Sequence, residues 1–289
     1  NRAITDTFEP GSTMKPLAVL SALEFGTATL DTIVDTHPGT MRIGGSWVRD
    51  PNNYKKLDLT GIIQKSSNMG VAKLVLEMPH QHVVGLYNNM GLGEDTGLGL
   101  AGESSGIFSY RQRWSDFERA TFSYGYGLSV TAVQLARAYA TMANGGINRP
   151  LSIIKNNEPD PGQRVLAQKH ALAMLEMMEA NIGPGGTATR AQVHGYRVGG
   201  KTGTARKAIA GGYGDDYIAS FAGVGPISNP SIVTVVVINE PAGDFYHGGE
   251  IAAPVFASIM GAALQLLNVT PDADTGPALI SRTGGRNGD

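Results

Sequence analysis

The fold of this chain is decided near its start, where residues 8–26 read FEPGSTMKPLAVLSALEFG. Apolar residues recur at helical spacing over Pro16–Phe25, and the glycine that follows, Gly26, is a usual C-terminal stop. A proline is tolerated in the first turn of a helix, because the N–H that it lacks would have no intrahelical partner there. The stretch therefore predicts a helix that starts at Ser12–Lys15.

Ser12 and Lys15 are spaced so that their side chains share one face of a helix. The lysine amine can then reach the serine hydroxyl and take its proton, which activates a serine as a nucleophile. The same pattern recurs at Ser152 and Lys155. That copy follows Pro150 in an extended β-branched stretch, so we interpret Ser152 as a strand residue whose lysine points to the opposite face.

A second set, Ser66-Ser67-Asn68, lies between two helical segments that we predict at residues 59–65 and 69–78. It brings two hydroxyls and an amide to a break between helices. Further helices are predicted at residues 80–90, 131–143, 168–182 and 251–267.

Beyond Arg197 the pattern changes to strands, predicted at residues 196–206, 217–225 and 232–239 and expected to pair antiparallel. The first strand carries Lys201-Thr202-Gly203-Thr204. Lys201 and Thr202 also complete a phosphate-loop pattern that begins at Gly195. A phosphate loop needs a helix that starts at its Lys-Thr pair, whereas a glycine-rich turn follows here. Nucleotide binding is therefore kept as a remote alternative.

Other patterns carry less chemistry. Residues 102–106, Gly-Glu-Ser-Ser-Gly, match a nucleophile elbow but lack the strand before and the helix after, so we interpret them as a surface turn. His80 and His82 are two residues apart on a predicted helix and do not converge on one metal ion. The chain has 289 residues, a net charge of -2 and no cysteine. These values give no electrostatic footprint for nucleic acid and exclude thiol nucleophiles.

Taken in order, the three sets resemble the motifs of the penicillin-binding protein and serine β-lactamase superfamily. Longer stretches such as LTGIIQKSSN (59–68), KTGTARK (201–207) and INEPAGDFYHGGEIAAPVF (238–256) are similar to the transpeptidase domain of division-specific, septal class B penicillin-binding proteins. The resemblance implies an α+β fold with an antiparallel sheet of about five strands, flanked by helices, plus an all-helical subdomain.

The same resemblance sets expectations for the extent of the domain. Family members carry further strands upstream of the serine, whereas eleven residues precede Ser12 here, so the sheet can lack its N-terminal strands. We expect an N-terminally truncated transpeptidase domain over residues 1–267 and a flexible C-terminal tail over residues 268–289.

By resemblance, the chain is a peptidoglycan D,D-transpeptidase that cross-links stem peptides during septal cell-wall synthesis through an acyl-enzyme and is inhibited covalently by β-lactams. The implied catalytic residues are Ser12, Lys15, Ser66 and Asn68, and the implied substrate-binding residues are Lys201, Thr202, Gly203 and Thr204. No cofactor and no metal are expected.

The resemblance also implies partners and a location. These are a septal glycan polymerase and other divisome proteins, the periplasmic face of the bacterial inner membrane, and a membrane anchor in the full-length protein. Two alternatives use the same residues: a β-lactamase or D,D-carboxypeptidase, which passes the acyl group to water, and a non-catalytic β-lactam sensor. Glu103 lies in a loop suited to water activation, but Ile107 stands where one β-lactamase branch has an asparagine.

Overall fold

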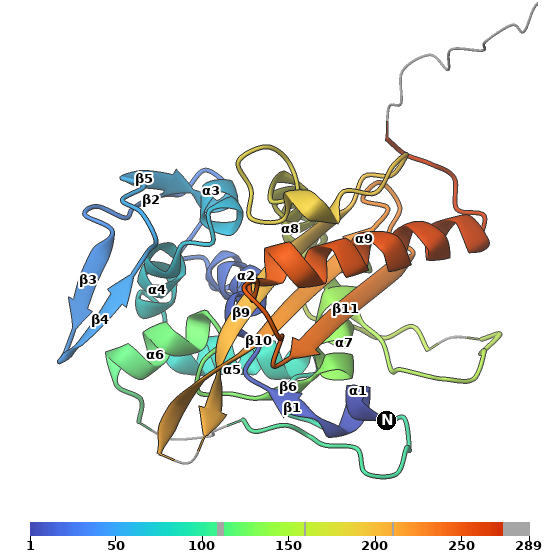
Figure 1. The fold of residues 1–289 in the computed structure, drawn as a ribbon, viewed down its shortest axis with the longest axis horizontal. Helices are drawn as coiled ribbons and strands as arrows, with labels where there is room; N and C mark the ends of the chain where they lie inside the picture. Colours follow the sequence, from blue (N-terminus) through green and yellow to red (C-terminus); the bar gives the residue numbers. More distant parts are fainter. Residues whose placement is uncertain (109–112, 159, 210, 274–289) are drawn as a thin grey trace, which may run out of the picture.

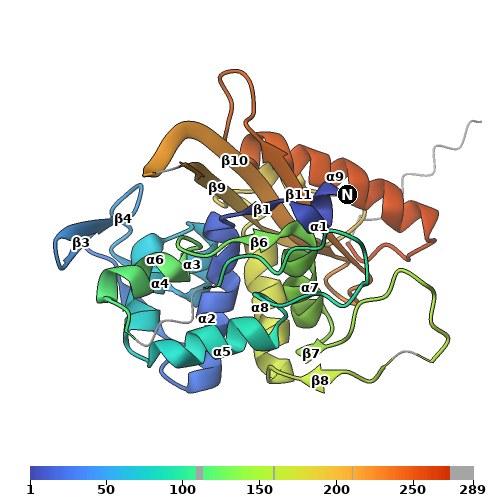
Figure 2. The same ribbon diagram turned by 90° about the horizontal axis from the view of Figure 1, so that it is seen from below.

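The computed structural model describes residues 1–108, 113–158, 160–209 and 211–273, which form an antiparallel sheet between helical layers (Figure 1). The strand order is β11-β10-β9. The strands are β9 (Gly199–Ile209), β10 (Gly212–Gly225) and β11 (Ile232–Asn239), and the helices packed on them are α7 (Ala132–Ala143), α8 (Gln168–Ala180) and α9 (Gly248–Leu266). Figure 2 shows α9 on one face of the sheet and the other two helices on the opposite face.

Successive side chains of each strand point to opposite faces of the sheet, and thus to these two layers in turn. Strand β10 pairs in antiparallel register with both neighbours. Phe221 of β10 packs against Phe256 of α9, with ring centroids 4.5 Å apart. Its partner on β9 is Thr202, whereas Lys201 lies opposite Ala222, which belongs to the core on the other face. Lys201 therefore faces the helical part of the molecule.

Helix α2 (Lys15–Phe25) runs through the middle of the helical part and is buried over residues 15–23. Its sequence is apolar on nearly all sides, as a helix surrounded by packing requires. The 3₁₀ helix η1 (Gly11–Met14) leads into it, Pro16 lies in its first turn, and it ends at Gly26. The predicted helix and both of its end signals are confirmed.

Four shorter helices complete the helical part, and the break between the first two coincides with the predicted one. They are α3 (Leu59–Gln64), α4 (Asn68–Leu76), α5 (His80–Asn89) and α6 (Asp116–Ser123). Side chains from these helices, from α2 and from α7 and α8 share one hydrophobic core. The helices predicted at residues 80–90, 131–143 and 168–182 are confirmed within two residues at each end.

Small two-stranded sheets and short helices lie around the main sheet and the larger helices. The pairs are β1 (Thr7–Phe8) with β6 (Val130–Thr131), β2 (Ile33–Asp35) with β5 (Lys56–Asp58), β3 (Thr40–Ile43) with β4 (Ser46–Arg49) and β7 (Ile147–Asn148) with β8 (Gln163–Arg164). The short helices are α1 (Arg2–Thr5) and the 3₁₀ helix η2 (Thr189–Ala191). The β2–β5 and β3–β4 pairs lie together at one end of the molecule, drawn in blue in Figure 1. Sequence reasoning predicted none of these short strands.

The predicted α+β class is confirmed. Within the described residues the main sheet has three strands rather than the five or so that the resemblance implied, and all three are those predicted from the sequence. The chain stays packed beyond residue 267, because Tyr196 donates to the Val269 carbonyl and Asp272 accepts the amide N–H of Arg197 and of Ser228. The rest of the expected tail, residues 274–289, lies outside the described residues.

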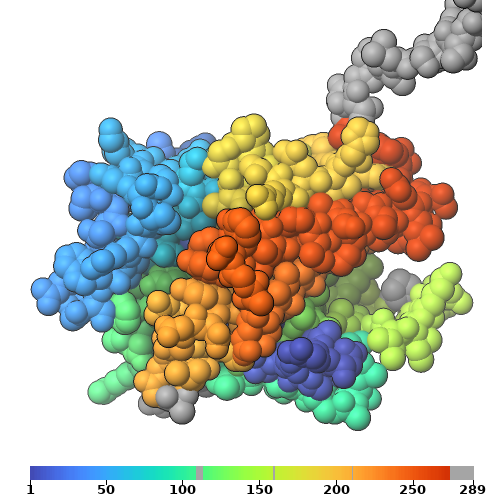
Figure 3. Space-filling model, viewed as in Figure 1, coloured from blue at the N-terminus to red at the C-terminus, as the bar shows by residue number. Residues whose placement is uncertain are grey.

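Helix α9 is long and apolar enough, by length and composition, to cross a membrane, and no other helix in the described residues is. It lies along the sheet, where it buries Phe256, Met260 and Leu264. In the space-filling view its residues form a band across the front of the molecule (Figure 3). The helix therefore covers one face of the sheet with one side and lies at the surface of the molecule with the other.

Gly125 provides a test of how tightly the serine turn is held. Its φ is 87°, and a Cβ there would lie 2.2 Å from the carbonyl oxygen of Gly11. Gly26 has a nearly identical φ of 88° but no atom within 4 Å of a Cβ. We expect Gly26→Ala to cost about 1–2 kcal/mol of unfolding free energy through backbone strain alone, and Gly125→Ala roughly 2 kcal/mol more, since backbone must move.

Urea denaturation of the two variants and the wild type measures these free energies. Equal losses in both variants would show that the Gly11–Gly125 contact places no steric demand on the fold.

Candidate active site

Ser12 lies in the η1 turn, directly before Lys15 at the start of α2. The Lys15 amide donates to the Ser12 carbonyl, so the turn continues into the helix without a break. The hydroxyl of Tyr139, on α7, donates to the Thr13 carbonyl at 2.9 Å. The turn that carries the candidate nucleophile is thus fixed by the helix that follows and by a neighbouring helix.

Ser66 occupies the break between α3 and α4, with a φ of 55° in the left-handed region. Its hydroxyl oxygen lies 2.9 Å from Lys15 Nζ and 3.0 Å from Lys201 Nζ, and its carbonyl also accepts from Lys15. A hydroxyl oxygen can accept two hydrogen bonds, so both amines can donate to it at once. One residue from each of the three predicted sets therefore meets at a single hydroxyl group.

The two lysines are almost completely buried, with 1% of Lys15 and none of Lys201 exposed. Burial disfavours an ammonium ion and lowers the pKa of Lys201 to about 7. Burial also lowers the pKa of Lys15 well below its ordinary value. The positive charge of Lys201 adds to that effect, and the negative charge of Asp50 opposes it. A neutral amine, able to accept a proton, is therefore accessible near neutral pH.

Threonine hydroxyls line the other side of β9. The Thr202 and Thr187 hydroxyl oxygens are 3.0 Å apart, and the Thr204 hydroxyl accepts the amide N–H of Gly248 at 3.0 Å. Lys201 Nζ lies 3.4 Å from the Thr202 hydroxyl, which links the two faces of the strand. The Thr204 hydroxyl, which accepts here, can still donate to an anion, so this strand can hold a carboxylate.

Gly203 is required by packing. A Cβ there would lie 2.3 Å from Ser220 Oγ, 2.8 Å from the Pro10 carbonyl oxygen and 3.0 Å from Thr13 Cγ2. The resemblance implied that this glycine binds substrate. The structure adds that the serine turn itself packs on the strand at this point, so any larger residue would push Ser12 away from Lys201.

Asn68 is the first residue of α4, and its side-chain amide donates to the Arg49 carbonyl at 2.9 Å. Its described hydrogen bonds run to Arg49, at the end of β4, and to Asp50, whereas Lys15 and Lys201 both contact Ser66. Lys15, Ser66 and Lys201 therefore form a close lysine–serine group, with Asn68 at its edge.

Sequence reasoning missed three polar residues that support this group: Asp50, Asn181 and Thr187. Asn181 is fully buried, donates to the Gly200 carbonyl at 2.8 Å and accepts from the Thr187 hydroxyl at 2.9 Å. Both residues lie near turn-rich segments where polar side chains are ordinary, and only the fold reveals what they contact.

Comparison with known proteins identifies the family. The family model of the penicillin binding protein transpeptidase domain matches residues 1–261 of this chain. The chain belongs to this family.

Curated relatives share sequence with nearly the whole of this chain. The peptidoglycan D,D-transpeptidase FtsI of Escherichia coli K12 is 50% identical over 276 residues, which cover 95% of this chain and 47% of the relative. The probable peptidoglycan D,D-transpeptidase PenA of Neisseria gonorrhoeae is 40% identical over 272 residues, 94% of this chain and 46% of the relative. The chain thus spans about half the length of these relatives.

A solved structure agrees with the fold. The apo transpeptidase domain of Burkholderia pseudomallei penicillin-binding protein 3 superposes with a TM-score of 0.91 at 41% identity. The match covers 94% of this chain and 83% of that chain.

The competing motifs do not form sites in this transpeptidase domain. Lys201 and Thr202 lie inside β9 and start no helix, so the phosphate-loop pattern lacks its structural context. Our interpretation of Ser152 as a strand residue is wrong: it is exposed and lies just before a bend, where its hydroxyl contacts the amide and carbonyl of Ile154. The Glu103 carboxylate, in the elbow-like segment, is bound by the amide and hydroxyl of Thr96.

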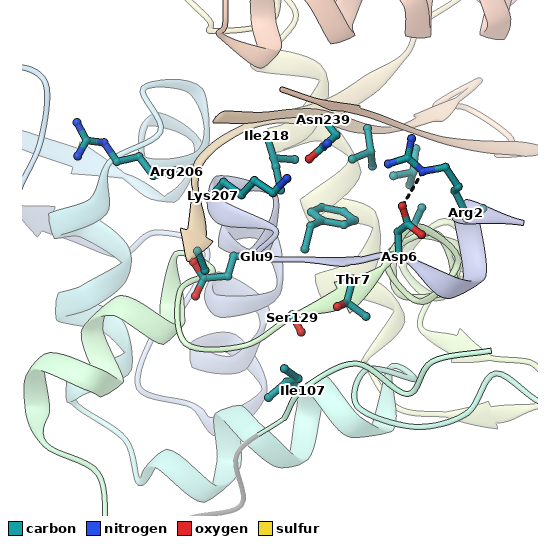
Figure 4. A pocket seen from close by; sticks show the side chains of 16 residues that line it. Arg2, Asp6, Thr7, Glu9, Ile107, Ser129, Arg206, Lys207, Ile218 and Asn239 are labelled. Atoms are coloured by element: carbon teal, nitrogen blue, oxygen red, sulfur yellow. Dashed lines mark hydrogen bonds and ion pairs between the residues drawn. The ribbon is translucent and has the colours of Figure 1, made fainter. Parts of the chain in front are cut away.

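A cavity of about 720 Å³ lies elsewhere, between the N-terminal segment and the sheet (Figure 4). Its walls include Ile218, Val235 and Val237 of the sheet, and an ion pair between Arg2 and Asp6 lies at its side. None of the predicted site residues lines this cavity. The cavity therefore lies apart from the lysine–serine group.

The buried state of Lys201 predicts a pH-dependent stability. Its pKa falls from an ordinary value of 10.5 to about 7 in the folded protein, so the unfolded chain binds more protons between these values. The stability of the wild type relative to Lys201→Met should therefore rise as the pH increases from about 7 toward 10.5, and stay constant below about 7. Urea denaturation of both proteins at several pH values measures the difference. A difference that does not change with pH would contradict the burial of a neutral amine.

Proposed function

We propose that this chain is the acyl-transfer domain of a peptidoglycan D,D-transpeptidase. The observation that carries the proposal is the Ser66 hydroxyl held between two buried lysines, Lys15 and Lys201, beside the turn that contains Ser12. The names of the relatives and the family match support the same reaction. The substrate would be a peptidoglycan stem peptide that ends in D-Ala-D-Ala.

In the first half-reaction, the Ser12 oxygen attacks the carbonyl carbon of the penultimate D-alanine while its proton passes to neutral Lys15. The proton then moves through Ser66 to the nitrogen of the leaving D-alanine. The C–N bond breaks as the Ser12 ester forms. Lys15 and Ser66 share a 2.9 Å contact, so a proton can travel between them without an intervening water.

Substrate binding would fall to β9 and Asn68. Lys201, Thr202 and Thr204 would hold the terminal carboxylate, with Gly203 between the two hydroxyls, and Asn68 would hold the peptide backbone. Backbone N–H groups of Ser12 and Thr204 would donate to the oxyanion, and each such donor lowers the barrier by about 3 kcal/mol in typical enzymes.

In the second half-reaction, an amine of another stem peptide attacks the Ser12 ester, forms the cross-linking amide and returns the serine. A β-lactam presents a strained amide to the same groups and leaves Ser12 acylated. The chemistry of both half-reactions needs no metal and no cofactor.

We extend the proposal to the context of the domain. The transpeptidase domain would occupy residues 1–267, followed by a C-terminal tail, within a longer protein that carries a membrane anchor. It would act on the periplasmic face of the inner membrane during septum formation, beside a glycan polymerase and other division proteins. That the chain covers about half of the FtsI relative supports a longer protein, and the relative's name supports a role in cell-wall synthesis.

Hydrolysis is the alternative that uses the same nucleophile. Glu103, the residue considered for water activation, is bound by Thr96, which does not favour that role. Mass spectrometry after penicillin treatment separates the two reactions, because a transpeptidase keeps the adduct and a β-lactamase loses it. An assay with two stem peptides separates an enzyme from a non-catalytic β-lactam sensor.

Labelling with a fluorescent penicillin tests the nucleophile. Ser12→Ala should abolish covalent labelling, and Lys15→Ala should slow it roughly 10²- to 10⁴-fold with the fold retained, because the base is lost. Ser152→Ala is the matched control, since Ser152 stands in the same Ser-x-x-Lys pattern but lies exposed, and it should label like the wild type.

Labelling that survives in Ser12→Ala would overturn the assignment. Saturable ATP binding that Lys201→Ala abolishes would instead favour the phosphate-loop alternative.

A further inference from the structure

The carboxylate of Asp50, in the loop after β4, faces the turn that carries Ser66. Its Oδ2 accepts the Ser67 hydroxyl at 2.6 Å. Its Oδ1 accepts the amide N–H of Asn68 at 2.6 Å and that of Met69 at 3.0 Å. One carboxylate therefore binds Ser67, which follows Ser66, and the first two residues of α4.

The contacts extend on both sides of this carboxylate. Ser67 is fully buried, and its hydroxyl also accepts the amide N–H of Gly70 at 2.8 Å, which caps α4. The carbonyl of Arg49, next to Asp50, accepts the Asn68 side-chain amide. The end of the β3–β4 hairpin thus holds the backbone and the side chains of the turn together.

The turn needs such support because of its conformation. Ser66 has a φ of 55°, which costs free energy for a residue with a side chain and persists only where the surroundings enforce it. A relaxed Ser66 would carry its hydroxyl and carbonyl away from Lys15, which both groups contact.

We propose that Asp50 is a positioning residue for acyl transfer, whose carboxylate fixes the Ser66–Asn68 turn so that the Ser66 hydroxyl stays between Lys15 and Lys201. The inference rests on the proposed function. None of the described contacts of Asp50 is with Ser12. Asp50 acts through Ser67 and the backbone of α4.

The alternative is that Asp50 only caps a helix, and Asp58 offers a matched comparison. The Asp58 carboxylate caps α3 by accepting the Gly61 amide N–H at 2.6 Å. Its described hydrogen bonds lie within α3 and do not reach the Ser66 turn. Replacing either aspartate removes a helix-capping carboxylate, but only Asp50 bonds to the turn.

The experiment measures the acylation kinetics and melting temperatures of Asp50→Ala, Asp58→Ala and the wild type with a chromogenic β-lactam. We expect both variants to melt at lower temperature. At saturating β-lactam, Asp50→Ala should acylate about 10- to 100-fold more slowly, since small displacements of a catalytic group have effects of this size, whereas Asp58→Ala should stay within about twofold of the wild type. Equal rates in the two variants would overturn the proposal.

Asp50→Asn keeps the shape of the side chain and carries the test if the alanine variant does not fold. The charged groups that act on Lys15 are Lys201, from β9, and Asp50 itself. Because Lys15 serves as base when neutral, loss of the Asp50 charge should lower its pKa and move the acidic limb of the acylation rate to lower pH, together with a lower maximal rate. An unchanged limb and rate would contradict the proposal.

These outcomes are separate from a failure of the proposed function. If the wild type itself is not acylated, the transpeptidase assignment fails. If the wild type reacts, and Asp50→Ala and Asp50→Asn react as fast as the wild type, only the role of Asp50 fails.

Discussion

The burial of two lysine side chains around one serine hydroxyl is the constraint on which this structure depends. Lys15 comes from a helix and Lys201 from a strand, and each amine must find acceptors after leaving water. Ser66 provides an acceptor for both. A shift of α2, of the α3–α4 turn or of β9 would leave an amine buried without its partner, so these three elements must keep fixed relative positions.

Two close contacts at glycines hold these elements together, and the one at Gly125 is made entirely by backbone groups. At Gly203 the strand meets Pro10 and Thr13 of the serine turn, and at Gly125 a neighbouring turn meets Gly11, whose N–H donates to the Gly125 carbonyl. Backbone groups have few ways to rearrange, so close packing here is stiff. The buried helix α2 then carries this rigidity from the serine turn into the core.

Local patterns predicted much of this arrangement. Helical spacing located Ser12 and Lys15, and a β-branched run located β11, because both periods are written in neighbouring residues. The same reasoning failed at Ser152, where the β-branched Ile153 and Ile154 are exposed and the serine bonds to its own segment. Asp50 was missed for a different reason. Its contacts join segments that only the folded hairpin brings together, and no sequence period marks such a contact.

The paired lysines also connect substrate binding to the state of the base. Two positive charges in one buried site repel, and burial already places the pKa of Lys201 near 7. The pair therefore favours states in which at most one of the two lysines is protonated. A substrate carboxylate bound at β9 would stabilise the proton on Lys201. The resulting positive charge would in turn favour neutral Lys15. In the proposed reaction, Lys201, which binds the substrate carboxylate, thereby helps to keep Lys15 neutral and able to accept the Ser12 proton.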